Sequence, residues 1–293
     1  MKLGLVGVGL IGGSIAFDLR KYGQVKHIYG YDENPKHLQN AFDFGMIDSI
    51  STLEQLAKEC DYIIVSIPVG ASIGVIRTLL SSCPTSTTIF DVGSTKEVIA
   101  HHFESHPRRH QLVLTHPMAG TEFSGPAAAH SGMFDGKAVV ICDQERSGVD
   151  HLEKIISIYG LLGMRVIFMS SHSHDLHVAF VSHLSHISSF VLAETVLEKE
   201  KDERKIFDLA SGGLESTVRL AKSSPSMWTS IFEQNRENIL MALSDYIMQL
   251  QKFQNQLQNK KYEEIFKMMN EANEIKRVLS QITRTRAEKN EKK

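Results

Sequence analysis

The sequence predicts an α/β domain with a doubly wound parallel sheet, followed by an all-α domain. Three observations predict this: short apolar segments alternate with helical patterns, a glycine-rich turn joins the first such pair, and helical periodicity alone continues after about residue 170. Repetition of strand, helix and strand favours parallel strands, because each helix returns the chain to the same edge of the sheet. The 293 residues suffice for two domains of ordinary size.

Seven segments are typical of strands covered on both faces, because several are apolar without interruption. The predicted strands are residues 3–6, 27–31, 62–67, 88–92, 112–115, 138–142 and 165–168. The predicted helices are residues 12–22, 35–44, 69–81, 96–104, 149–162, 179–197, 228–257 and 262–282. We therefore expect a first domain of residues 1–170, a helical domain of residues 171–283, and a charged tail of residues 284–293 without a site.

Composition argues against several kinds of partner. The formal net charge of −2 gives no electrostatic case for binding nucleic acid or an anionic membrane. No uninterrupted run of about 18 apolar residues occurs, so no transmembrane helix is expected. The cysteines Cys60, Cys83 and Cys142 form no CxxC pair, which indicates buried thiols in a reducing compartment. With no signal-peptide pattern at its start, the chain is predicted to be cytoplasmic.

A glycine-rich loop follows the first predicted strand and opens the first predicted helix. Gly7 would allow a tight turn, Gly9 would let the backbone approach a pyrophosphate, and Gly12 would let helix and strand pack closely. The helix N-terminus offers free N–H groups to phosphates. The spacing therefore predicts a Rossmann-type dinucleotide-binding domain, and the candidate cofactor-binding residues in the loop are Gly7, Gly9, Leu10, Ile11 and Gly12.

Asp32 ends the second predicted strand, twenty positions after Gly12. A carboxylate at this place would hydrogen-bond the adenosine ribose and repel a 2′-phosphate, and no arginine follows nearby. The sequence therefore favours NAD over NADP. A glycine turn with a helix-capping aspartate is the alternative. Ser66, near the end of the third predicted strand, and Pro68, directly after that strand, complete the candidate cofactor site.

Several downstream segments together resemble the prephenate and arogenate dehydrogenase family. Residues 91–96 (DVGSTK) and 116–122 (HPMAGTE) resemble the end of a Rossmann strand and the catalytic histidine loop. Residues 174–175 (HD) and 182–186 (SHLSH) resemble the first helical signature of the family, and residues 219–228 (RLAKSSPSMW) resemble the second. These motifs follow one another in the family's order.

The resemblance implies oxidation of prephenate, or of its amino analogue arogenate, with NAD(P) and loss of carbon dioxide. The product would be 4-hydroxyphenylpyruvate or tyrosine. It also implies that the helical domain carries substrate-binding residues and forms a homodimer, and that the family uses no metal.

By resemblance, the catalytic residues are His116 and Ser94. A neutral imidazole at His116 would stabilise the transition state, because the substrate hydroxyl becomes more acidic as hydride departs. A histidine before a proline is alternatively a simple turn residue. Ser94 would hydrogen-bond His116 or the substrate hydroxyl, and an N-cap for the helix starting near Lys96 is an equally physical role.

The substrate-binding residues that the resemblance implies lie in the His116 loop and in the helical domain. The guanidinium of Arg219 would bind a carboxylate of the dianionic substrate. Glu122 is either a gating acid or a solvated loop residue, and His183 is either a supporting residue or a buried core histidine. The candidates are Arg219, His186, Glu122, Ser182 and His183.

Two further positions affect this interpretation. Asp175 would anchor the helix between the domains or orient a histidine. Glu215 stands where many relatives carry a basic residue, which leaves open both an ion-pair gate with Glu122 and the choice between prephenate and arogenate.

Three other functions compete with prephenate oxidation: arogenate dehydrogenase, a β-hydroxyacid dehydrogenase, and a non-catalytic NAD-sensing scaffold. Ser94, His116 and Arg219 together favour an enzyme over a scaffold. Five histidines between residues 172 and 186 lack the spacing of a zinc site, so no metal is expected.

Overall fold

The computed structural model describes residues 1–203 and 205–280, and the chain forms two compact units, Met1–Ile239 and Leu240–Lys293. The predicted tail, residues 284–293, and the last two positions of the predicted helix 262–282 lie outside the described residues. All candidate site residues belong to the first unit. The predicted domain boundary at residue 170 stays a prediction.

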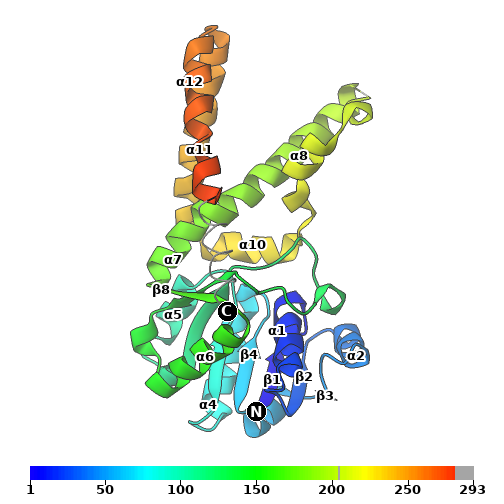
Figure 1. Cartoon of the computed structure of the whole chain (residues 1–293), viewed down its shortest axis with the longest axis vertical. Helices are drawn as coiled ribbons and strands as arrows, with labels where there is room; N and C mark the ends of the chain where they lie inside the picture. The colour runs from blue at the N-terminus through cyan, green and yellow to red at the C-terminus, as the bar shows by residue number, and fades with distance from the viewer. Residues whose placement is uncertain (204, 281–293) are drawn as a thin grey trace. The chain divides into compact units, whose positions relative to one another are not determined.

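One eight-stranded sheet forms the centre of the first unit (Figure 1). Its strands are β1 (Lys2–Val6), β2 (His27–Tyr31), β3 (Ser49–Ile50), β4 (Tyr62–Val65), β5 (Thr88–Asp91), β6 (Leu112–Pro117), β7 (Ala138–Cys142) and β8 (Arg165–Met169). They are ordered β3-β2-β1-β4-β5-β6-β7-β8. The chain runs outward from β1 to β3 and starts again at β4 on the other side of β1. The topological switch, where such sheets bind ligands, therefore lies between β1 and β4.

The Rossmann-type doubly wound sheet is confirmed, with two differences in detail. The strand β3 was not predicted, because two residues are too few to show a periodic pattern. The strands β6 and β7 pair in antiparallel fashion, whereas all other neighbours are parallel. The reason lies in the connection, which holds only the short helix η2 (Pro126–Ala128) and no helical crossover of the kind that parallel strands require.

The helices are α1 (Leu10–Lys21), α2 (Pro35–Asp43), α3 (Leu53–Glu59), α4 (Val69–Ser82), α5 (Glu97–Phe103), α6 (Val149–Leu161), α7 (Ser171–Val178), α8 (Leu184–Glu203), α9 (Gly212–Thr217), α10 (Pro225–Gln234), α11 (Arg236–Gln258) and α12 (Tyr262–Ala272). The short helix α3 was not predicted. The predicted helix 228–257 is divided at Asn235, which ends α10 in a non-helical conformation.

The predicted helix 179–197 is part of a longer one that begins at Ser171. The hydroxyl of Ser170 accepts a hydrogen bond from the N–H of Ser173 and so caps α7. A π-helical turn, η4 (Ala179–His183), joins α7 to α8. Such wide turns inside helices are frequent at functional sites, and this one contains two of the candidate residues, Ser182 and His183.

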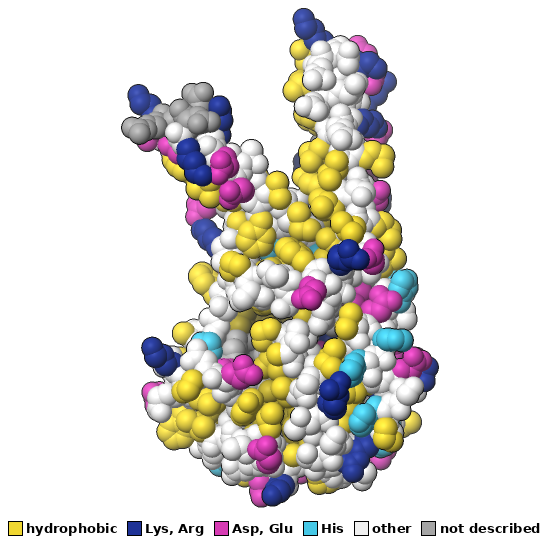
Figure 2. Space-filling model, turned by 180° about the vertical axis from the view of Figure 1, so that it is seen from behind, with side chains coloured by type: hydrophobic (Ala, Val, Ile, Leu, Met, Phe, Trp, Pro, Cys, Tyr) yellow, Lys and Arg dark blue, Asp and Glu magenta, His cyan; other side chains and the backbone are white. Residues whose placement is uncertain are grey.

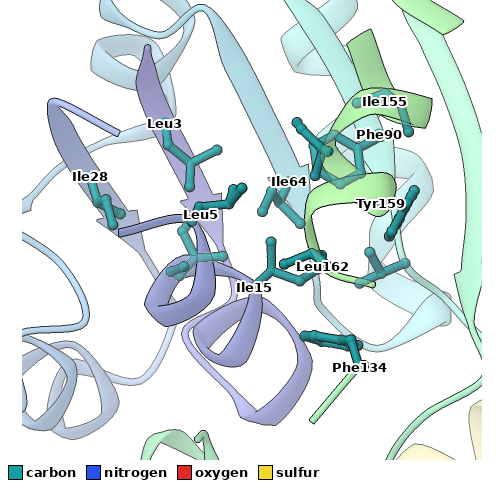
Figure 3. Close-up of a cluster of buried hydrophobic side chains, with 14 of the residues drawn as sticks. Leu3, Leu5, Ile15, Ile28, Ile64, Phe90, Phe134, Ile155, Tyr159 and Leu162 are labelled. Atoms are coloured by element: carbon teal, nitrogen blue, oxygen red, sulfur yellow. The ribbon is translucent and has the colours of Figure 1, made fainter. Parts of the chain in front are cut away.

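Alternate strand residues pack against helices on both faces of the sheet, which explains the uninterrupted apolar strands. On one face, Leu5, Ile64 and Phe90 pack with Ile15 of α1 and Tyr159 of α6 (Figure 3). Each such side chain contributes about 1.5–3 kcal/mol on burial. The other face is covered by α3, α4 and α5, with a core that includes Ile63, Val65, Ile89, Leu114, Leu56, Ile76, Leu80, Ile99 and Phe103.

One helical span, Ser171–Lys201, is long and apolar enough to cross a membrane by length and composition alone. The sequence prediction did not foresee this, because it counted uninterrupted apolar residues. The same span contains His174, Asp175 and His183, which are almost fully buried and hydrogen-bonded within the first unit. These contacts are typical of a helix packed inside a protein, whereas only 22% of the apolar window of the span as a whole is buried.

The packing at Gly12 gives a test of this fold. A Cβ at Gly12 would lie 2.6 Å from Leu5 Cδ1 and 2.8 Å from the Gly7 carbonyl oxygen, whereas a Cβ at Gly74 of α4 meets nothing within 4 Å among the described residues. Gly12→Ala should therefore lower the free energy of unfolding by about 1–3 kcal/mol. The control Gly74→Ala should leave it unchanged or raise it by up to about 1 kcal/mol. Urea unfolding followed by circular dichroism measures both, and equal stability of the two variants contradicts the prediction.

Candidate functional site

The parallel strands β1, β2, β4, β5 and β6 end at one edge of the sheet, and the site is built from the segments that follow them. The glycine loop follows β1, Asp32 follows β2 and Ser66 follows β4. His116 lies near the end of β6. The topology therefore brings the candidate cofactor-binding and catalytic residues to the same edge.

The three glycines of the loop have three different physical roles. Gly7 has a φ of +88°, and a Cβ there would lie 2.3 Å from the carbonyl oxygen of Ser66, so only glycine fits. A Cβ on Gly9 would meet nothing within 4 Å among the described residues, so the backbone is open to a ligand on that side. Gly12 permits the close helix–strand packing described above.

The N-terminus of α1 has the free donors that a phosphate needs. Gly9 is the N-cap and has no side chain that could accept from the first N–H groups of the helix. The N–H of Gly12 donates to Ser66 Oγ at 3.0 Å. Within the described part of the chain, no hydrogen-bond acceptor faces the N–H groups of Leu10 and Ile11. These donors and the helix dipole suit a pyrophosphate, so the residues present fit a dinucleotide. Pro68 is the N-cap of the neighbouring helix α4.

Asp32 is anchored by backbone N–H groups on both sides. Its Oδ2 accepts from the N–H of Val8 at 3.1 Å, and its Oδ1 accepts from the N–H of Asn34 at 2.9 Å. Asn34, rather than Asp32, caps α2. Asp32 therefore fixes the glycine loop as well as presenting a carboxylate at the end of β2.

His116 belongs to a hydrogen-bonded chain of three residues. His116 Nδ1 lies 2.8 Å from His174 Nε2, and His174 Nδ1 lies 2.7 Å from Asp175 Oδ1. Both His174 and Asp175 are at most 1% exposed. The contact between the two histidines was not predicted, although the HD motif had been singled out, because 58 positions separate them along the chain.

Asp175 also caps α5 from outside that helix. Its Oδ1 accepts from the N–H of Lys96 at 2.8 Å, and its Oδ2 accepts from the N–H of Glu97 at 2.8 Å. The alternative role of Ser94 as the N-cap is therefore wrong, because the carboxylate of Asp175 occupies the cap position. The hydroxyl of Ser94, in the loop between β5 and α5, makes no hydrogen bond to the described residues. Asp175 itself both anchors the helix and contacts a histidine, as expected.

A buried ion pair lies next to this chain. The ammonium of Lys96 contacts Asp91 Oδ2, and both side chains are almost completely buried. Asp91 also accepts hydrogen bonds from the N–H groups of Gly93 and Thr115, at 3.0 and 3.3 Å. These partners compensate the cost of removing the two charges from water.

Burial holds the pKa of His116 well below its ordinary value of 6.5, and the positive charge of the Lys96 ammonium adds to the effect. The imidazole of His116 is therefore neutral around neutral pH. A neutral ring offers one nitrogen lone pair, which is what a hydrogen-bond acceptor for a substrate hydroxyl requires.

The helical part of the first unit contributes two histidines in different environments. His186 stacks on Trp228, with ring centroids 3.6 Å apart, and its Nδ1 lies 3.0 Å from the carbonyl oxygen of Ser182. His183 is buried and accepts a hydrogen bond from Asn235 Nδ2 at 3.1 Å. Burial lowers the pKa of His183 to about 4. His183 therefore fits the alternative of a core histidine, whereas His186 lies partly open beside an aromatic ring.

Arg219 forms an ion pair with Glu122 at 2.9 Å. The side chain of Arg219 is 50% exposed and that of Glu122 is 16% exposed. Glu215, which had left this pair open, is exposed and lies 3.9 Å from Lys222 instead. The charge of Glu215 therefore lies beside Lys222, and Arg219 keeps its pair with Glu122.

The structure thus joins His116 to His174 and Asp175, and Glu122 to Arg219. The Ser182 hydroxyl, like that of Ser94, has no hydrogen-bond partner within residues 1–203 and 205–280. Across the same residues, no group of three or more His, Cys, Asp or Glu side chains could hold a metal ion.

Two family models match consecutive parts of this chain. The model of the prephenate dehydrogenase nucleotide-binding domain matches residues 15–168, and that of the prephenate dehydrogenase dimerization domain matches residues 170–271. A crystal structure of prephenate dehydrogenase from Aquifex aeolicus, in complex with hydroxyphenyl propionate and NAD+, has a TM-score of 0.86 and 30% identity, covering 95% of this chain and 97% of that chain.

Two proteins of known sequence are also similar to this chain. Prephenate dehydrogenase from Bacillus subtilis is 28% identical over 275 residues, which are 93% of this chain and 74% of the relative. Cyclohexadienyl dehydrogenase from Zymomonas mobilis is 27% identical over 252 residues, which are 85% of this chain and 86% of the relative. The resemblance found in the motifs is confirmed: the chain belongs to the prephenate dehydrogenase family of oxidoreductases.

Proposed function

We propose that this chain is an NAD-dependent dehydrogenase that converts prephenate to 4-hydroxyphenylpyruvate in tyrosine biosynthesis. The observation that carries the proposal is the hydrogen bond between His116 and the buried His174, at the edge of the sheet where the glycine loop lies and where burial lowers the pKa of His116. Family membership supports the proposed substrate class, and the geometry supports the proposed roles of the residues.

NAD, when bound, supplies the acceptor for the hydride. The N–H groups of Leu10 and Ile11 would bind its pyrophosphate, with Gly9 leaving room for the close approach. Asp32 would accept hydrogen bonds from the adenosine ribose. Ser66 fixes the first turn of α1 through Gly12. These residues hold and orient the cofactor without taking part in bond changes.

His116 would accept the proton of the substrate hydroxyl. As hydride leaves the carbinol carbon, the hydroxyl becomes more acidic and its proton moves to the imidazole. The bond to the ring carboxylate breaks, its electron pair enters the ring, carbon dioxide departs, and the imidazole returns the proton to the phenolate oxygen of the product. Because the imidazole starts neutral, this interaction strengthens only as the transition state forms. Ser94 would hydrogen-bond the same hydroxyl.

The substrate side chain would lie against the helical residues. The guanidinium of Arg219 would bind a carboxylate of the substrate, and this contact would replace its ion pair with Glu122. His186 and Ser182 would line the pocket, and His183 would support them from the core.

Arogenate is a second candidate substrate, and one observation favours it. The Nδ1 of a neutral His186 donates to the carbonyl oxygen of Ser182, so its Nε2 carries a lone pair. A lone pair suits the ammonium of arogenate better than the keto acid of prephenate. Steady-state assays with both substrates, following NADH formation, decide between them, and activity with neither contradicts the proposed function.

We also propose that the chain is a cytoplasmic homodimer. The second family model describes a dimerization domain, and hydrophobic side chains gather on the surface of the helical segments (Figure 2). Val191 and Leu197 of α8, for example, are 59% and 50% exposed. The three buried free cysteines fit a reducing compartment.

His116→Asn should lower kcat about 10²–10⁴-fold with little change in the KM of the substrate, because the lost interaction forms mainly in the transition state. In the unmodified enzyme, the lowered pKa of His116 places the acid limb of kcat/KM below pH 6.5. Steady-state kinetics across pH measure both effects. The exposed His101 provides the control His101→Asn, which should leave kcat unchanged. A near-normal kcat for His116→Asn contradicts the proposal that His116 accepts the substrate proton.

Asp32→Ala should narrow the preference for NAD over NADP, because it removes both the ribose acceptor and the charge that repels a 2′-phosphate. We expect the ratio of kcat/KM for the two cofactors to fall about tenfold or more, as one lost hydrogen bond to a charged group predicts. Glu33→Ala, at the exposed neighbouring acid, is the control. An unchanged ratio in Asp32→Ala would place the ribose elsewhere.

Arg219→Gln should act mainly on the KM of the substrate, raising it about tenfold or more through loss of a charge-assisted hydrogen bond. The kcat should change little, because the carboxylate that Arg219 binds takes no part in hydride transfer. Arg236→Gln, at another exposed arginine that pairs with Glu237, is the matched control. An equal KM in the two variants contradicts the role of Arg219.

A further inference from the structure

We propose that His174 is a positioning residue that, held by Asp175, fixes the tautomer of His116 so that its free lone pair lies on Nε2. The inference deepens the proposed function, because it assigns the atom of His116 that receives the substrate proton. It rests on the geometry of the chain from Asp175 through His174 to His116.

The direction of the hydrogen bonds is set at Asp175. Its two carboxylate oxygens accept from the backbone N–H groups of Lys96 and Glu97, which can only donate. Both contacts suit an ionised carboxylate, which accepts at each oxygen and has no proton to donate. The remaining contact of Oδ1, to His174 Nδ1 at 2.7 Å, must also be accepted by the carboxylate. His174 therefore carries a proton on Nδ1.

The same direction continues to His116. A neutral His174 with its proton on Nδ1 has a lone pair on Nε2, and this nitrogen lies 2.8 Å from His116 Nδ1. His116 must then donate from Nδ1, and its Nε2 remains unprotonated. In the opposite tautomer, two lone pairs would face each other between the rings, and Nε2 would donate to the substrate hydroxyl instead of accepting from it.

Burial makes this arrangement stiff. His174 and Asp175 are on α7, both at most 1% exposed, so water does not compete for their hydrogen bonds. The Asp175 carbonyl oxygen accepts from Asn235 Nδ2 at 2.7 Å, which adds a second anchor to the residue. His172 offers a contrast on the same helix: its ring is 67% exposed and its Nδ1 contacts Glu97.

The test combines ring ¹⁵N NMR of the full-length protein, labelled at histidine, with kinetics of His174 variants. We expect the resting protein to show His116 with its proton on Nδ1, the His116 signals being assigned by their absence in His116→Asn. In His174→Leu, His116 should become a mixture of tautomers, and kcat should fall about 100-fold with little change in KM. His174→Gln, whose amide oxygen can accept from His116 Nδ1, should recover about tenfold of that loss.

The control is His172→Leu, which should alter neither kcat nor the His116 signals. A proton on His116 Nε2 in the resting protein overturns the proposal, and so does a doubly protonated His174. A kcat of His174→Leu equal to that of the control also overturns it. If neither prephenate nor arogenate is oxidised, the proposed function fails on its own, while the NMR measurement still decides the tautomer.

Discussion

The carboxylate of Asp175 is the contact on which the site depends. It accepts hydrogen bonds from two backbone N–H groups at the start of α5 and contacts His174 Nδ1, so it joins α5, which covers the sheet, to α7. A buried N–H group without a partner costs about 1–3 kcal/mol. Loss of this carboxylate would therefore release α5, α7 and the ring of His174 together. One side chain couples the stability of the unit to the orientation of His116.

Charge around His116 follows from the same packing. Burial alone favours the neutral imidazole, and the ammonium of Lys96 increases the effect although Asp91 pairs with it. A buried ion pair usually contributes little net stability, because desolvation offsets the attraction between the charges. Its value here is electrostatic: the positive end lies near His116, which under the proposed function must stay unprotonated until hydride leaves. The backbone N–H of Lys96 donates to Asp175, so the pair and the histidine chain share one residue.

The glycine loop and the longer strands could be predicted, because both depend on interactions between residues close together in the sequence. The roles of Gly7, Gly9 and Gly12 follow from backbone geometry over six residues, and the clashes at the built Cβ positions agree with the predicted turn and packing. The strands were predictable because burial on both faces leaves them apolar.

Contacts between distant residues were not predictable. Asp175 and Lys96 are 79 positions apart, so the sequence indicates only the nearby Ser94 as a possible cap of α5. The antiparallel β7 and the π turn η4 likewise depend on tertiary packing, which leaves no periodic signal in the sequence.

Glu215 shows how an acid in the same segment can leave the pair of Arg219 and Glu122 intact. A second acid would be expected to draw Arg219 away from Glu122. Lys222, however, lies 3.9 Å from the carboxylate of Glu215. Because both side chains are exposed, this contact forms at little cost in desolvation. Arg219 and Glu122 form a half-exposed pair, which is weak for the same reason. Under the proposed function, a substrate carboxylate can therefore replace Glu122 on Arg219 with only a small loss, and the strength of the displaced pair sets how much binding energy remains for the substrate.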